Sequence, residues 1–211
     1  MTYYRCIDKG NGPTKLFVGG IHGHEGETTI NFLKSLSSSD FSNGKTFIYN
    51  FDNSPYISTL KKEYYDSKIG KYIIKLIKKH KPDFYTELHC YNIKNYKKLI
   101  SQNRRESQGV PPLIELKNQI LISSISPLIR TKYFPMETVC KTLEIPCLDK
   151  NSFNEGYRDF GFNTYLNVIK LIAKSDNRKE FEEEMKKIYP DQVKLAIKYS
   201  NEVFGKGYPP F

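Results

Sequence analysis

Short apolar runs alternate with amphipathic stretches along the first two thirds of the chain. Apolar runs bounded by glycine, proline and asparagine predict buried strands, here at residues 3–7, 16–18, 46–51, 84–88, 99–101, 120–123 and 139–145. Apolar positions at helical spacing predict helices at 27–36, 67–79, from 163 onward, 177–187 and 191–204. Because strands and helices alternate, we expect an α/β fold, with a mixed, largely parallel sheet flanked by helices and a helical C-terminal tail.

The length of 211 residues suits one well-buried core and argues against two full domains. We expect residues 1–175 to form the α/β domain and residues 176–211 to form a helical extension packed on it. The first residues lack an apolar signal core, and no stretch approaches the roughly 18 apolar residues that cross a bilayer. The sequence therefore predicts a soluble, cytoplasmic protein with no membrane partner.

The formal net charge of +10 changes this picture little. Of the 33 basic residues only six are arginine, and the lysines are spread along the chain without a nucleic-acid-binding motif. We therefore expect no nucleic-acid partner, although the charge can steer a small anionic substrate toward the protein.

The four cysteines show no Cys-x-x-Cys pair, which argues against a structural zinc knuckle. Buried thiols in a reducing compartment are the default interpretation. Cys90, beside a histidine, can contact a metal or act as a reactive thiol, but alternation along a strand favours packing.

The first candidate for chemistry is the glycine-rich segment at residues 19–26, which follows a buried strand and contains His22 and Glu25. Its glycines allow the backbone to bring an imidazole and a carboxylate together. These are two of the three protein ligands of many catalytic zinc sites. In the competing interpretation, the glycines form a tight turn and Glu25 caps the next helix. His24 is an alternative to His22, but a surface role suits it better.

A second buried strand ends in His89. Ligands in open α/β sheets gather outside the carboxyl ends of the strands, so His89 can join His22 and Glu25 as the third ligand. On its own His89 can equally be a core histidine that binds a backbone carbonyl. His80 is typical of a solvated helix end.

Glu144 lies in the apolar strand predicted at 139–145, where an unpaired charge is costly. In a zinc hydrolase such a glutamate serves as the general base, which takes a proton from water and returns it to the leaving group. A buried ion pair or a solvent-facing position also explains it. Glu87 is the rival, but its place two residues before His89 also suits orientation of that ligand.

Taken in order, the segments at 20–26, 87–91 and 142–146 resemble the zinc carboxypeptidase superfamily, particularly its succinylglutamate desuccinylase/aspartoacylase-like branch. Further stretches at 56–60, 109–116 and 123–127 look like an uncharacterised family of methanogenic archaea, which spans nearly the whole chain and has no assigned substrate. The resemblance implies a zinc-carboxypeptidase-like fold, with His22, Glu25 and His89 as zinc ligands and Glu144 as base.

The chain departs from the superfamily in its arginines. Carboxypeptidases place substrate-binding arginines between the first ligand pair and the last histidine, but this chain has none from Gly26 to Leu88. The strand end at 48–53 keeps an asparagine without its arginine neighbour. Arg104 and Arg105 are the candidate substitutes, since guanidinium groups bind carboxylates in pairs of hydrogen bonds and stabilise an oxyanion. An ordinary solvated loop also explains them, and residues 103–112 are our candidate for a mobile loop over the site.

We therefore expect a zinc-dependent hydrolase that cleaves an amide or peptide bond in a small substrate, such as a peptide, an N-acyl amino acid or a modified metabolite. The alternative is a non-catalytic binding protein on the same scaffold, with or without the metal (Zn²⁺), that recognises an anionic partner through its basic surface. A third interpretation, in which all three motifs are structural, has no metal.

Overall fold

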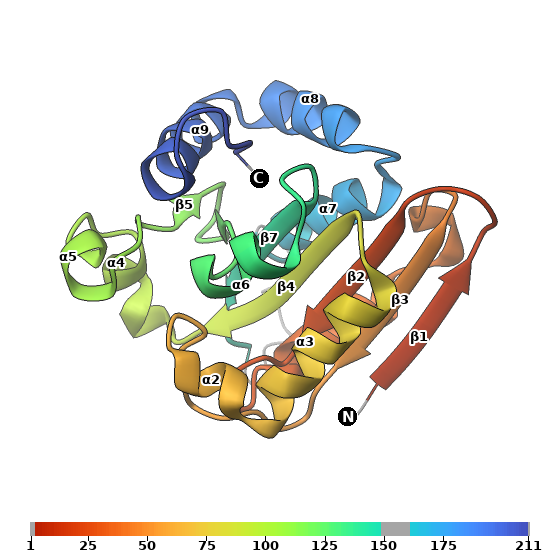
Figure 1. Cartoon of the computed structure of the whole chain (residues 1–211), viewed down its shortest axis with the longest axis horizontal. Helices are drawn as coiled ribbons and strands as arrows, with labels where there is room; N and C mark the ends of the chain where they lie inside the picture. Colours follow the sequence, from red (N-terminus) through yellow and green to blue (C-terminus); the bar gives the residue numbers. More distant parts are fainter. Residues whose placement is uncertain (1–2, 149–160, 211) are drawn as a thin grey trace.

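The computed structural model describes residues 3–148 and 161–210, and the described part is a mixed α/β structure around one seven-stranded sheet (Figure 1). The strand order is β1-β3-β2-β4-β7-β6-β5. The strands are β1 (Tyr3–Asp8), β2 (Thr14–Gly19), β3 (Lys45–Asn50), β4 (Phe84–Tyr91), β5 (Ile114–Glu115), β6 (Leu121–Ser123) and β7 (Val139–Pro146).

The centre of the sheet is parallel and its edges are antiparallel. β3, β2, β4 and β7 run in one direction, whereas β1 pairs antiparallel with β3 and β6 pairs antiparallel with β7. β4 is buried along its whole length, as expected for a central parallel strand covered on both faces. The predicted mixed, largely parallel sheet is confirmed at this level.

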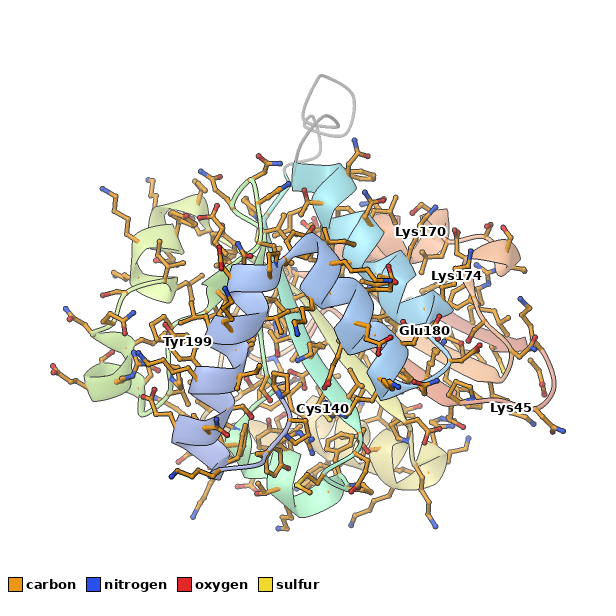
Figure 2. The ribbon with its side chains drawn as sticks, turned by 90° about the horizontal axis from the view of Figure 1, so that it is seen from above. Lys45, Cys140, Lys170, Lys174, Glu180 and Tyr199 are labelled. Atoms are coloured by element: carbon orange, nitrogen blue, oxygen red, sulfur yellow. A yellow bond between two sulfur atoms is a disulfide. The ribbon has the colours of Figure 1, made fainter. Side chains whose placement is uncertain are left out.

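Helices cover both faces of the sheet. One face packs on α3 (Lys68–His80) and α6 (Pro127–Tyr133), which lie in front of the sheet in Figure 1. The other packs on α1 (Gly26–Ser35), α7 (Gly161–Lys174), α8 (Arg178–Ile188) and α9 (Pro190–Phe204), and the last three cross the sheet in Figure 2. The remaining helical segments are η1 (Ser38–Asp40), α2 (Lys62–Asp66), η2 (Ile93–Asn95), α4 (Tyr96–Leu99) and α5 (Arg104–Gln108).

The C-terminal tail is helical, as the sequence predicted, and it contacts the sheet. Phe181 and Met185 of α8 lie fully buried in the same core cluster as α7, and α9 contacts β5. In the part of the chain that the structure describes, no helix is both long and apolar enough to cross a membrane.

The strand expected at residues 99–101 is wrong, because Leu99 ends α4 instead. Tyr96, Leu99 and Ile100 stand at i, i+3 and i+4, so a helix turns all three toward the small apolar cluster around Tyr91 and Leu113. His80 also differs from the prediction, because it is half-buried, stacks on Phe47 and hydrogen-bonds to Tyr49.

The cysteines correct the expectation of free buried thiols. Cys90 at the end of β4 and Cys147 just after β7 form a disulfide with a Cα–Cα distance of 4.7 Å. Cys6 is exposed, and only the Cys140 thiol is both free and buried among the described cysteines. The disulfide joins two strands that already pair in parallel, so it reinforces one end of an existing ladder.

Candidate metal centre

The candidate ligands come from the carboxyl ends of two neighbouring strands, β2 and β4. After β2, Gly20 adopts a positive φ of 71°, and an added Cβ there would lie 2.1 Å from the Phe51 carbonyl oxygen. A Cβ on Gly26 would lie 1.9 Å from the same oxygen. Glycine is therefore required at both positions, since the turn passes directly over the end of β3.

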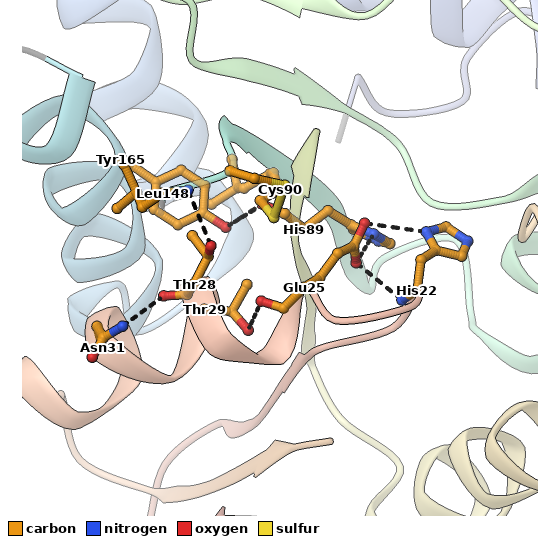
Figure 3. The surroundings of a disulfide bond; sticks show 11 residues. His22, Glu25, Thr28, Thr29, Asn31, His89, Cys90, Leu148 and Tyr165 are labelled. Carbon is orange, nitrogen blue, oxygen red and sulfur yellow. Dashed lines mark hydrogen bonds and ion pairs between the residues drawn. A yellow bond between two sulfur atoms is a disulfide. The ribbon is translucent and has the colours of Figure 1, made fainter. Parts of the chain in front are cut away.

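Glu25 is the residue that precedes α1, but its side chain makes no capping hydrogen bond. Its Oε2 atom instead accepts a hydrogen bond of 3.0 Å from the His22 backbone N–H. The same oxygen lies 3.0 Å from His89 Nδ1, and Glu25 Oε1 lies 3.4 Å from His22 Nδ1 (Figure 3). The geometry thus disfavours the capping interpretation of Glu25.

One potential ligand atom from each of His22, Glu25 and His89 lies within 4.8 Å of the others. The exposed fraction of the side chain falls from 26% for His22 to 12% for Glu25 and 2% for His89. Within the described residues, His22 Nε2 is buried without a hydrogen-bond partner, whereas His89 Nε2 faces Glu87 at 3.5 Å. Both Nδ1 atoms face the Glu25 carboxylate, and two imidazole nitrogens beside a carboxylate fit a divalent metal such as zinc, which binds nitrogen and oxygen ligands.

His24 does not join this group. Its side chain is 59% exposed and lies 3.9 Å from Glu27, near the ring of Tyr56. The choice of His22 over His24 therefore agrees with the geometry.

Three carboxylates surround His89. Glu25 faces its Nδ1 atom, Glu87 lies 3.5 Å from its Nε2 atom, and Glu144 stands opposite it in the β4–β7 register. Burial alone would lower the pKa of His89, but Glu25 and the other two carboxylates raise it well above its usual value. The cluster is therefore rich in negative charge, which a cation can balance.

This environment shifts the pKa values of Glu25 and Glu144 in opposite directions. Burial would raise the pKa of Glu25, but contacts with His89 and His22 outweigh it and lower the pKa to about 2. Burial raises the pKa of Glu144 to about 7. The negative charges of Glu25 and Glu87 also raise this pKa, whereas the positive charges of His89 and Arg104 lower it. Glu144 retains some contact with solvent where it lines the cavity. A carboxyl with a pKa near neutrality can both accept and return a proton.

Glu87 is buried, with only 2% of its surface exposed. Tyr85 donates a 2.9 Å hydrogen bond to one carboxylate oxygen, and Thr142 donates one of 3.4 Å to the other. These contacts anchor Glu87 behind His89, where it can orient the imidazole. The contact with Thr142 was not predicted, although Thr142 lies two residues before Glu144 on the same face of β7.

The two candidate arginines occupy different places. Arg104 lines a cavity of about 600 Å³ together with the metal-binding candidates, and it donates a 2.9 Å hydrogen bond to the Pro111 carbonyl. Arg105 forms an ion pair with Glu202 of α9 and lies over the ring of Tyr199. Only Arg104 is brought to the cavity, and the expected loop at 103–112 is in part the helix α5.

Asn50, at the end of β3, is fully buried. Its amide donates to the Gly26 carbonyl at 3.1 Å, and its Oδ1 atom accepts a 2.6 Å hydrogen bond from Thr29. The side chain therefore fastens α1 to β3 from a fully buried position and does not line the cavity.

The comparisons with known proteins match nearly the whole chain to one family. The family described as "Uncharacterized protein conserved in archaea (DUF2119)" matches residues 10–205. A relative from Methanocaldococcus jannaschii, named "Uncharacterized protein MJ0501", is 42% identical over 205 residues, which cover 95% of this chain and 93% of the relative. No solved structure matches the chain significantly. The chain belongs to this archaeal family, DUF2119.

Proposed function

We propose that this protein is a zinc-dependent hydrolase of an amide or peptide bond in a small substrate. One observation carries the proposal: ligand atoms of His22, Glu25 and His89 lie within 4.8 Å of one another beside a cavity that Glu144 also lines. The order of these motifs along the chain resembles that of the zinc carboxypeptidase superfamily, and we propose a related fold on this basis.

Two histidines and one glutamate are the donor set of many hydrolytic zinc sites. A zinc ion held there supplies a Lewis acid, which polarises a carbonyl group and makes water more acidic. The excess of carboxylates around His89 supports a bound cation, since a divalent ion offsets negative charges that otherwise repel one another.

The remaining residues have distinct roles in this proposal. Glu144 accepts a proton from the attacking water and returns it to the leaving amine. Arg104 holds an anionic group of the substrate, since its guanidinium lines the cavity and carries positive charge close enough to act on the pKa of Glu144. Glu87 fixes the orientation of His89.

The second candidate is a binding protein that keeps the metal but has no hydrolytic activity. The positions of Asn50 and Arg105 favour this alternative, because neither side chain contributes to the cavity in the described part of the chain. Metal content and turnover distinguish the two candidates when they are measured on the same preparation.

The experiment begins with elemental analysis of the purified protein and of its variants, each first dialysed against buffer that contains zinc. We expect one zinc per chain, lost in His22→Ala and His89→Ala and retained in His24→Ala, which alters a neighbouring exposed imidazole. Equal zinc content in all four proteins would remove the metal site from the proposal.

Turnover is then measured against a library of short peptides and N-acyl amino acids. Glu144→Gln should keep the zinc and lose at least 100-fold in kcat, on the order of a lost general base. Glu183→Gln, at an exposed position on α8 that does not line the cavity, serves as the control and should keep full activity. Zinc with no hydrolysis of any compound would favour the binding protein.

A further inference from the structure

The cavity beside the metal-binding candidates has two kinds of wall. One part carries His22, Glu25, His89 and Glu144, whereas much of the remaining wall is aliphatic or aromatic. The apolar part includes Leu99, Val110, Leu113, Ala196, Val203 and Phe204. Such a surface favours a ligand that removes apolar groups from water.

Helix α9 provides a fixed part of this wall. Arg105 of α5 forms its ion pair with Glu202, and Gln102 reaches the Tyr199 hydroxyl at 3.4 Å. In Figure 2 α9 crosses the sheet beside the segment that carries α4 and α5, and Tyr199 lies on that side of the helix. Ser200 donates a 2.7 Å hydrogen bond to the Pro209 carbonyl, which holds the chain after α9 against the helix. Polar contacts therefore hold α9 both to the segment around α5 and to the chain that follows the helix.

Arg104 introduces a positive charge into this apolar part. It lies on the same short helix as Arg105, and Pro111, whose carbonyl accepts one of its hydrogen bonds, also lines the cavity. Within residues 3–148 and 161–210, no carboxylate forms an ion pair with Arg104. A guanidinium offers five N–H donors in a planar fork, and among the described residues only the Pro111 carbonyl accepts from Arg104, which leaves donors for a bound carboxylate.

We infer that the cavity takes an amphiphilic carboxylate, with its anionic head at Arg104 and an extended apolar arm against α9. Resting on the proposed function, this assigns the substrate class: an amide of a carboxylate-bearing compound with an alkyl or aromatic arm, rather than a small, wholly polar N-acyl amino acid. Val203 is then a specificity-determining residue, because it lines the cavity from α9.

The test measures binding of straight-chain carboxylates, from butyrate to decanoate, to metal-free protein by isothermal titration calorimetry. Burial of each added methylene should lower the Kd by about fourfold until the cavity is filled. Val203→Trp, which fills the cavity, should abolish this dependence on chain length. Ile197→Trp is the matched control, since Ile197 lies on α9, is 42% exposed and does not line the cavity. Val203→Met gives a smaller effect in the same direction and replaces the tryptophan variant if that variant does not fold.

The anionic head is tested separately with Arg104→Gln. This variant should weaken binding of every chain length by the same factor, because contact with the head does not depend on the arm. A Kd that is independent of chain length in the wild type, or equal effects of Val203→Trp and Ile197→Trp, would overturn the inference. The assay uses no metal, so a protein that binds these carboxylates without hydrolysing any amide refutes the proposed function alone. Hydrolysis restricted to wholly polar substrates refutes this inference alone.

Discussion

The disulfide between Cys90 and Cys147 provides a quantitative test of how the site is held together. Cys90 follows His89 on β4, and Cys147 comes three residues after Glu144. The perturbation is reduction of this bond, or its removal in Cys147→Ser. In the folded protein the two strands remain paired without it, and the Cys147 N–H also donates to the Tyr91 carbonyl at 2.9 Å.

Loss of the disulfide should therefore lower stability chiefly by increasing the conformational entropy of the unfolded chain. The bond closes a loop between cysteines 57 residues apart, and the chain-entropy relation for such a loop gives about 4 kcal/mol of stabilisation. Domains have roughly 5–15 kcal/mol of total stability, so the reduced protein should remain folded but unfold at much lower denaturant concentration.

The assay is urea unfolding of oxidised and reduced protein, followed by circular dichroism in the presence of a chelator, so that metal binding does not contribute. We expect reduction and Cys147→Ser each to lower the free energy of unfolding by about 4 kcal/mol, in line with the loop-closure relation. Cys6→Ser, which removes an exposed free thiol, should leave the response to reductant intact. A change below about 1 kcal/mol on reduction would refute the entropic reasoning. An equal response to reductant in Cys147→Ser would show that the effect has another source.

Three further predictions concern the supports of the site and the core. Glu87→Gln should weaken zinc binding by about 10–100-fold without removing it, since Glu87 acts on His89 from behind; competition with a chromophoric chelator measures this, and an unchanged affinity would exclude the role. Burial lowers the pKa of Lys15 to about 8 from 10.5, so between these pH values the unfolded chain binds more protons and the free energy of unfolding rises with pH, by about 3 kcal/mol in all. Lys15→Met should remove this rise in urea titrations from pH 7 to 11, and parallel curves for both proteins would contradict it. Gly26→Ala forces a Cβ against the Phe51 carbonyl and should cost about 1–3 kcal/mol, whereas an unchanged midpoint in thermal unfolding would show that the turn adapts.

The central strands were predictable because their burial leaves a strong local signal. β2, β4 and β7 are buried along most of their length and are rich in apolar residues, as expected for parallel strands covered on both faces. The segment at 99–101 carries a weaker signal of this kind, because only Leu99 and Ile100 are apolar and so short a run fits a helix equally well. Its structure is set by contacts with Tyr91 and Leu113, which sequence spacing does not reveal.

The candidate ligands were predictable from the ends of these strands, whereas other parts of the site were not. Arg104 and Arg105 are adjacent in the sequence, but successive residues of a helix point about 100° apart, so one lines the cavity and the other binds α9. The contribution of α9 depends on how the tail folds back over β5, which no local pattern specifies. One feature of the sequence could have indicated the disulfide, because Cys90 and Cys147 each lie near the end of a strand that was predicted to be buried.

The strand order explains why residues so distant in sequence can act together. β2, β4 and β7 are consecutive in the sheet and parallel, so the turn after β2 and the ends of β4 and β7 open on the same edge. The β2 turn contributes His22 and Glu25, β4 contributes His89, and β7 places Glu144 directly opposite His89. Because both neighbours of β4 supply carboxylates to the same imidazole, negative charge accumulates where the three strands meet. That accumulation is costly in a structural core and useful in a metal centre, and it is the strongest electrostatic argument for a cation at this edge of the sheet.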